Sequence, residues 1–190
     1  MRVAVSGSHG TGKSTLIAEF LARRPEYAHE PEAFEVIGGD VELAEDEGPT
    51  ADGLHLLLEH TATALDSYAP GASVVFERSP VDYLAYAIAS RSWQRGSVAA
   101  FVEASLPLVR RSLSRLDLIA FLPLAPGGPA ARPGEDARFR KRVDRALTRV
   151  LLDDEYDLFG EAGTPRIVAL PASLEGRVTE LERAIGLRIG

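Results

Sequence analysis

Gly7-Ser8-His9-Gly10-Thr11-Gly12-Lys13-Ser14, close to the N-terminus, dictates the architecture of this chain. Two glycines separated by four residues and followed by Lys and Ser form the pattern of a phosphate-binding loop. The apolar run 2–6 before it is typical of a buried strand, and residues 14–22 after it carry apolar side chains at helical spacing. Strand, glycine loop and helix therefore follow one another in the order that a phosphate site needs.

The residue types of this loop suit a chain of phosphates. Glycine lets successive backbone N–H groups face one anion, and the following helix adds its positive N-terminal end. Lys13 is expected to reach the β- and γ-phosphates, and the Ser14 hydroxyl to take a position on Mg²⁺. The predicted nucleotide-binding residues are Gly7, His9, Gly10, Thr11, Gly12, Lys13, Ser14 and Thr15.

Composition limits the classes of protein to which the chain can belong. Its 190 residues and 45% hydrophobic content suit a single domain over residues 1–190. The formal net charge of −7 disfavours nucleic acid as a partner. The sequence has no Cys, which excludes disulfides and thiolate zinc sites, and no Asn, which excludes the guanine-reading Asn-Lys-x-Asp motif of GTPases.

Location is predicted from the N-terminus and from hydropathy. The first strand is expected to begin at residue 2, which leaves no room for a signal peptide. No apolar run approaches the ~20 residues of a membrane span. We therefore expect a cytoplasmic protein without a membrane partner, and leave open whether it forms a homodimer.

Strand and helix patterns alternate along the rest of the chain. The short apolar runs that we expect to form strands are 27–30, 72–76, 116–124 and 165–170. The segments with helical patterns are 51–68, 80–90, 95–113, a segment ending near 152, and 174–185. This alternation predicts a three-layer α/β fold, in which helices cover both faces of a five-stranded parallel sheet.

Charged side chains follow two of the predicted strands. Glu30 ends the strand at 27–30, and Glu77-Arg78-Ser79 follows the strand at 72–76. Because the carboxyl ends of parallel strands face the ligand crevice, both acids are expected near the phosphate loop. An acid at the end of an apolar strand is typical of Mg²⁺–nucleotide sites, so Ser14 and Glu77 are the predicted metal-binding residues. Ser79 and Asp82 also form a capping-box pattern that predicts a helix start.

Two further segments are distinguished by their charge. Residues 32–50 combine glycines with a cluster of acids and predict a flexible substrate-side segment, either a solvated loop or short helix or a flap over the acceptor. Residues 126–145 hold the strongest local positive charge in the chain. Because arginine clamps transferring phosphoryl groups, this segment is a candidate lid, with Arg132, Arg138 and Arg142 as candidate phosphate ligands.

The phosphate loop, Glu30-Pro31 and Glu77-Arg78-Ser79 together resemble the nucleoside-kinase branch of the P-loop kinases, which includes the deoxynucleoside kinases. The chain is similar as well to ribosylnicotinamide kinases and to small bacterial kinase-like proteins that carry general ATPase-domain names. This resemblance implies a P-loop NTPase fold with an Arg-rich lid, and Mg²⁺-dependent transfer of the ATP γ-phosphoryl group to a hydroxyl of a nucleoside-like molecule. It implies that Glu30 accepts the hydroxyl proton, that Arg78 holds the acceptor, and that Arg177 lies beside the adenine.

The resemblance does not extend to the residues that read the nucleobase. Deoxynucleoside kinases use a Gln in the region between Glu30 and Glu77, whereas the sole Gln of this chain is Gln94. The identity of the phosphoryl acceptor is therefore left open. Two alternative functions also stay open: a nucleoside monophosphate kinase, and a regulatory ATPase that uses nucleotide hydrolysis as a switch.

Overall fold

A parallel five-stranded sheet forms the centre of the structure, a computed structural model that describes residues 1–41, 43–44, 48–91, 93–124, 136–160 and 164–186. The strands are arranged in the order β2-β5-β1-β6-β7. Their bounds are β1 (Arg2–Ser6), β2 (Ala28–Glu30), β5 (Val74–Glu77), β6 (Leu118–Phe121) and β7 (Arg166–Ala169). The predicted five-stranded parallel sheet is confirmed.

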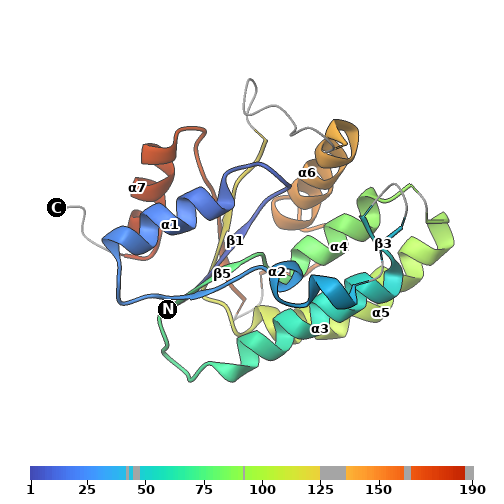
Figure 1. The fold of residues 1–190 in the computed structure, drawn as a ribbon, viewed down its shortest axis with the longest axis horizontal. Coiled ribbons are helices and arrows are strands. Elements are labelled where there is room, and N and C mark those ends of the chain that lie inside the picture. The colour runs from blue at the N-terminus through green and yellow to red at the C-terminus, as the bar shows by residue number, and fades with distance from the viewer. Residues whose placement is uncertain (42, 45–47, 92, 125–135, 161–163, 187–190) are drawn as a thin grey trace.

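Helices cover both faces of the sheet, as the sequence predicts (Figure 1). One face packs against α1 (Lys13–Arg23) and α7 (Leu174–Ala184). The other face is covered by a layer of four helices: α3 (Ala51–Ser67), α4 (Pro80–Ala89), α5 (Arg95–Leu113) and α6 (Ala137–Leu151). Among the described residues, no helix has the length and apolar character needed to cross a membrane.

Alternation along the central strand divides the core into two clusters. Side chains of successive strand residues point to opposite faces of a sheet. Val3 and Val5 of β1 therefore join the cluster beneath α1 and α7, whereas Ala4 joins the cluster beneath α3 to α6. The same alternation decides which way each charged residue at a strand end points.

The segment 32–50 contains more structure than its composition predicts. It holds the short helix α2 (Ala33–Ile37), which the sequence allows, and the 3₁₀ turn η1 (Gly38–Asp40). The antiparallel hairpin of β3 (Leu43–Ala44) and β4 (Gly48–Pro49) was not predicted. Most of the acids that suggested a solvated segment, Glu42, Glu45, Asp46 and Glu47, lie outside the described residues.

Candidate functional site

The phosphate loop joins β1 to α1 at the carboxyl edge of the sheet. Gly10 and Gly12 have φ angles of +63° and +93°, in the left-handed region that side chains other than glycine rarely adopt. At Gly7, a Cβ would meet the backbone oxygen of Leu122 and the hydroxyl of Thr11 at 2.9 Å. The glycines that define the sequence pattern are therefore required by backbone shape and by close packing.

Lys13 is held inside the loop that it belongs to. Its side chain is only 6% exposed, and its Nζ donates a hydrogen bond to the backbone oxygen of Ser8 at 3.3 Å. Burial, and after it the charge of Arg78, lower the pKa of Lys13 to about 8. This ammonium group is thus confined at the position where the sequence pattern expects phosphate oxygens.

Ser14 and Glu77 meet although they are far apart in sequence. The hydroxyl of Ser14, in the first turn of α1, donates to Oε1 of Glu77, at the end of β5, at 2.8 Å. A hydroxyl and a carboxylate are the oxygen donors that Mg²⁺ prefers, and Mg²⁺ takes its remaining ligands from water and phosphate. The described part of the chain has no group of three or more His, Cys, Asp or Glu residues that could hold a metal ion.

The other predicted loop residues fall into two groups. Thr11 is buried and its hydroxyl donates to the backbone oxygen of Ser8, which tightens the loop. His9 is exposed, and its Nε2 lies 2.7 Å from the hydroxyl of Tyr86 on α4. Thr15, in the first turn of α1, is exposed to solvent.

Arg78 is the most constrained residue of the site. It follows β5 with a φ of +80°, an uncommon conformation for a residue with a side chain. Although its side chain is only 1% exposed, Nη1 donates to the backbone oxygen of Gly7 at 3.1 Å and to Oδ1 of Asp82 at 3.3 Å. Its guanidinium also lies 5.0 Å from the centre of the Tyr86 ring. Arg78 is therefore fixed against the first residue of the phosphate loop.

Glu32 completes the surroundings of Arg78, and the sequence reasoning missed it. Its Oε1 accepts a hydrogen bond from Nε of Arg78 at 2.5 Å, and its side chain is 19% exposed. Burial by itself would raise the pKa of Glu32, but the charge and hydrogen bond of Arg78 outweigh it and lower that pKa. In the sequence, Glu32 was not distinguished from the rest of the segment 32–50. Its place directly after Glu30-Pro31 was the only signal in the sequence.

A small pocket lies beside Arg78 and contains a donor without a partner. Nη2 of Arg78 is buried and finds no hydrogen-bond acceptor among the residues that the structure describes. The pocket is lined by Glu30, Pro31, Ala33, His60, Thr61, Ala64, Phe76, Glu77 and Arg78. A buried donor left unsatisfied is costly, and the cavity of about 10 Å³ has room for one oxygen-sized group, so a single hydroxyl would fit beside Nη2.

Glu30 lies at the same carboxyl edge of the sheet as the phosphate loop, and its side chain points toward the face that α3 covers. It pairs in register with Phe76, whose side chain belongs to the core beneath α3 to α6. The hydroxyl of Tyr68, directly after α3, donates to Oε2 of Glu30 at 2.8 Å. Loss of hydration, together with this hydrogen bond, raises the pKa of Tyr68 to about 12. Glu77 lies one residue beyond Phe76 and points to the opposite side, toward Ser14.

Two arginines from distant elements contact the tip of the phosphate loop. Nη2 of Arg140, on α6, donates to the backbone oxygen of Gly10 at 3.0 Å. Nη1 of Arg177, on α7, donates to the backbone oxygen of Thr11 at 2.7 Å. Both side chains are buried. The structure thus places Arg177 against the phosphate loop. Its position beside the adenine, which the resemblance implies, stays a prediction.

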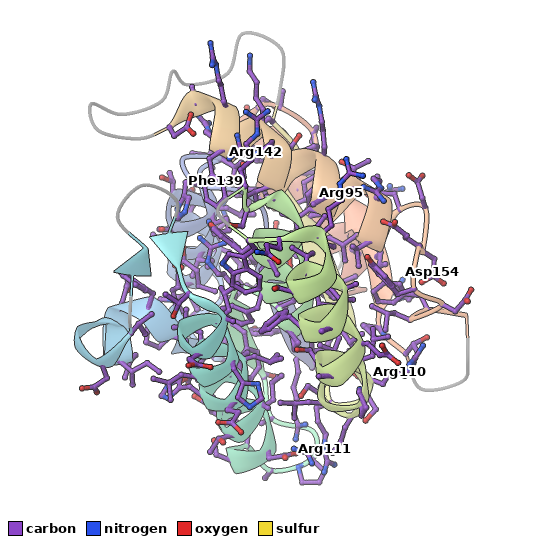
Figure 2. All side chains as sticks on the ribbon, turned by 90° about the vertical axis from the view of Figure 1, so that its right-hand side faces the viewer. Arg95, Arg110, Arg111, Phe139, Arg142 and Asp154 are labelled. Carbon is purple, nitrogen blue, oxygen red and sulfur yellow. The ribbon has the colours of Figure 1, made fainter. Side chains whose placement is uncertain are left out.

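Arg138 and Arg142, two of the three predicted lid arginines, are placed differently from Arg140. Arg138 is exposed at the start of α6, and Arg132 lies outside the described residues. Nε of Arg142 donates to the backbone oxygen of Ala89 at 2.7 Å, and its guanidinium lies over the neighbouring Phe139 ring (Figure 2). Arg140 could have been singled out in the sequence, because it shares a helical face with apolar residues three and seven positions on.

Comparisons with known proteins agree with this architecture. A family model described as an AAA domain matches residues 2–160, whereas no curated protein sequence matches the chain. Deoxyadenosine kinase from M. mycoides with bound products dCMP and dCDP superposes with a TM-score of 0.69 at 12% identity, over 98% of this chain and 99% of that one. The same kinase with bound dATP gives a TM-score of 0.68 at 11% identity, over 98% and 100% of the two chains. NadR protein in complex with NAD and AMP-PNP gives 0.65 at 20% identity, and this chain spans only 50% of its length. These structures share the fold of this chain.

Proposed function

The chain belongs to the AAA domain family, and from this premise we propose that it is an ATP-dependent phosphotransferase acting on a hydroxyl of a nucleoside or nucleoside-like small molecule. The observation that carries the proposal is the convergence of Lys13, the Ser14–Glu77 pair and Arg78 at one edge of the sheet. Nη2 of Arg78, which lies beside this centre and has no partner among the described residues, supports an acceptor site rather than a donor site alone.

On the donor side, the loop amides and Lys13 would hold the β- and γ-phosphates of ATP. Arg140 and Arg177 contact the loop from two sides and would keep its backbone in shape. Ser14 and Glu77 would hold Mg²⁺, which neutralises charge on the phosphates when it is bound. A small-molecule kinase of this kind would work in the cytoplasm, where ATP is available.

On the acceptor side, Arg78 would orient the hydroxyl through Nη2, and a carboxylate beside it would take the hydroxyl proton. Glu30 lines the pocket beside Arg78, and Glu32 accepts the hydrogen bond from Nε of Arg78. Phosphoryl transfer depends mainly on positioning and on stabilising charge, and a single arginine at the transferring group is worth about 10³–10⁵ in rate. Charged residues of both signs, fixed by hydrogen bonds, suit that task.

A panel of acceptors tests the proposal. The protein is incubated with ATP and Mg²⁺ and with adenosine, deoxyadenosine, deoxycytidine, nicotinamide riboside, AMP or dCMP, and the products are identified by mass spectrometry. We expect a phosphorylated nucleoside, no product without Mg²⁺, and loss of product in Lys13→Ala. Lys141→Ala is the matched control, because Lys141 is the chain's other lysine and is exposed on α6.

Two outcomes of this experiment would favour an alternative function over the proposed one. Products from AMP or dCMP alone would identify a nucleoside monophosphate kinase. ADP release that no acceptor changes would favour an ATPase that acts as a switch.

A further inference from the structure

Glu30 and Glu32 are separated by one residue but lie in different surroundings. Glu30 points with its register partner Phe76 toward the α3 side of the sheet. There, Tyr68 donates to Oε2 of Glu30, and the rings of Tyr68 and Phe76 meet edge to face with centres 5.6 Å apart. Glu30 is therefore part of the wall of the pocket, and the hydrogen bond described for its carboxylate comes from Tyr68.

Glu32 is tied to the phosphate loop through a single guanidinium. Nε of Arg78 donates a hydrogen bond to Oε1 of Glu32 at 2.5 Å, and Nη1 of the same guanidinium donates to the backbone oxygen of Gly7 at 3.1 Å. Glu32 and Lys13 also shift each other's pKa, the acid raising that of Lys13 and the ammonium lowering that of Glu32. The carboxylate of Glu32 thus lies within electrostatic reach of the group that would bind the γ-phosphate.

Nη2 of Arg78, which has no hydrogen-bond partner among the described residues, would place an acceptor oxygen close to Glu32. In a planar guanidinium, Nε and Nη2 donate from one edge, which is why carboxylates bind that edge with two parallel hydrogen bonds. Here Glu32 occupies Nε, and Nη2 has no partner in the part of the chain that is described. An oxygen bound at Nη2 would therefore lie next to the carboxylate of Glu32.

We propose that Glu32, and not Glu30, takes the proton of the acceptor hydroxyl, while Glu30 holds the acceptor in the pocket; this assignment rests on the proposed phosphotransferase function. The hydroxyl oxygen forms a bond to the γ-phosphorus as the bond from that phosphorus to the β,γ-bridging oxygen breaks. ADP leaves with the electron pair of the broken bond. The hydroxyl proton passes to the carboxylate of Glu32 and from there to solvent.

The electrostatic surroundings of Glu32 are compatible with this role. Arg78, Lys13 and His9 all lower the pKa of Glu32, so its side chain is an anion at neutral pH. A carboxylate of low pKa is a weak base. In a loose phosphoryl-transfer transition state, however, positioning and electrostatic stabilisation dominate, and an aspartate serves as the base in protein kinases.

Paired isosteric variants test the assignment. Glu32→Gln is expected to lower kcat by about 10²–10⁴ while the Kd for ATP, measured by calorimetry, stays within about threefold of the wild type. Glu30→Gln is expected to raise the KM for the acceptor more than it lowers kcat. Glu35→Gln is the control, because Glu35 is an exposed acid on the neighbouring turn of α2. The reverse pattern, with kcat lost in Glu30→Gln and kept in Glu32→Gln, would overturn the proposal.

Two further measurements separate this assignment from folding and from the proposed function itself. Glu32→Asp keeps a charge beside Arg78 and should recover part of the lost kcat, and thermal melting of each variant reports on folding. ADP release from ATP and Mg²⁺ alone uses water as the acceptor, so it needs no identified substrate. Glu32→Gln should slow this release at least tenfold, and equal rates would contradict the assignment. Absence of any phosphorylated product from the wild type would instead contradict the proposed function.

Discussion

Lys13 is a buried cation whose charge depends on what is bound to it. Without nucleotide, burial and the charge of Arg78 bring its pKa down to about 8. Phosphate oxygens would bring opposite charge next to the ammonium group, which raises the pKa again. ATP binding near pH 8 and above should therefore be accompanied by the uptake of a proton.

The affinity for ATP is expected to decrease as the pH rises. The affinity should be highest below pH 8, where Lys13 is already protonated. It should fall by up to about tenfold per pH unit as the pH rises above 8. The last phosphate proton, with a pKa near 6, is already lost in this range, so the charge of ATP itself stays constant. Calorimetric titrations at pH 7 and pH 9 measure the difference.

Lys13→Met removes the titrating group and is the control for this effect. Its weaker binding of ATP should be the same at both pH values. Equal affinity of the wild type at pH 7 and pH 9 would show that the pKa of Lys13 is not lowered as the structure indicates.

At the scale of elements, Asp82 joins helix α4 to the phosphate loop. Its Oδ2 accepts hydrogen bonds from the backbone N–H and the hydroxyl of Ser79, which closes the capping pattern at the start of α4. Its Oδ1 accepts from the N–H of Gly7 and from Nη1 of Arg78. The carboxylate is fully buried, so its removal leaves several buried donors without an acceptor and takes from Arg78 one of its two acidic partners.

Asp82→Ala is expected to lower the free energy of unfolding by about 3–5 kcal/mol, the usual effect of breaking a buried ion pair on one side. Urea denaturation measures the change. Asp52→Ala is the matched control, because Asp52 is also an acid in the first turn of a helix but is exposed. It should cost only about 0.3–1 kcal/mol through the helix dipole. Similar losses in the two variants would contradict this account of Asp82.

For the whole molecule, the two layers of helices place different parts of the site. The layer of α3 to α6 supplies Tyr68 and Arg140, and the layer of α1 and α7 supplies Lys13, Ser14 and Arg177. The sheet between them carries Glu30 and Glu77 on adjacent strands. Packing on either face therefore determines the geometry at the shared edge.

Leu181→Ala tests this dependence on the face of the sheet that α1 and α7 cover. Leu181 is fully buried beneath α7, so its truncation should cost about 2–5 kcal/mol. Because α7 also carries Arg177, which holds the backbone oxygen of Thr11, the affinity for ATP should fall as well. Leu174→Ala, at an exposed position of the same helix, should change stability by no more than about 0.5 kcal/mol. Unchanged stability in Leu181→Ala would refute the prediction.

Those parts of the protein that depend on local pattern could be predicted from the amino-acid sequence. The glycine spacing predicted the loop, because glycine takes the left-handed backbone of Gly10 and Gly12 without the steric cost that a Cβ would add. Apolar runs and helical periodicity predicted the parallel sheet and its helices, and Ser79 with Asp82 predicted the start of α4. The expectation that Glu30 and Glu77 lie at the loop edge followed from the shared direction of parallel strands.

Only the tertiary structure decided which side chains meet. The pairing of Arg78 with Glu32, of Tyr68 with Glu30, and of Arg140 with Gly10 joins residues separated by 46, 38 and 130 positions. Such contacts depend on strand order, on register and on the face to which each residue points. A shift of one residue in register turns every side chain of a strand to the opposite face, so no local pattern specifies these contacts.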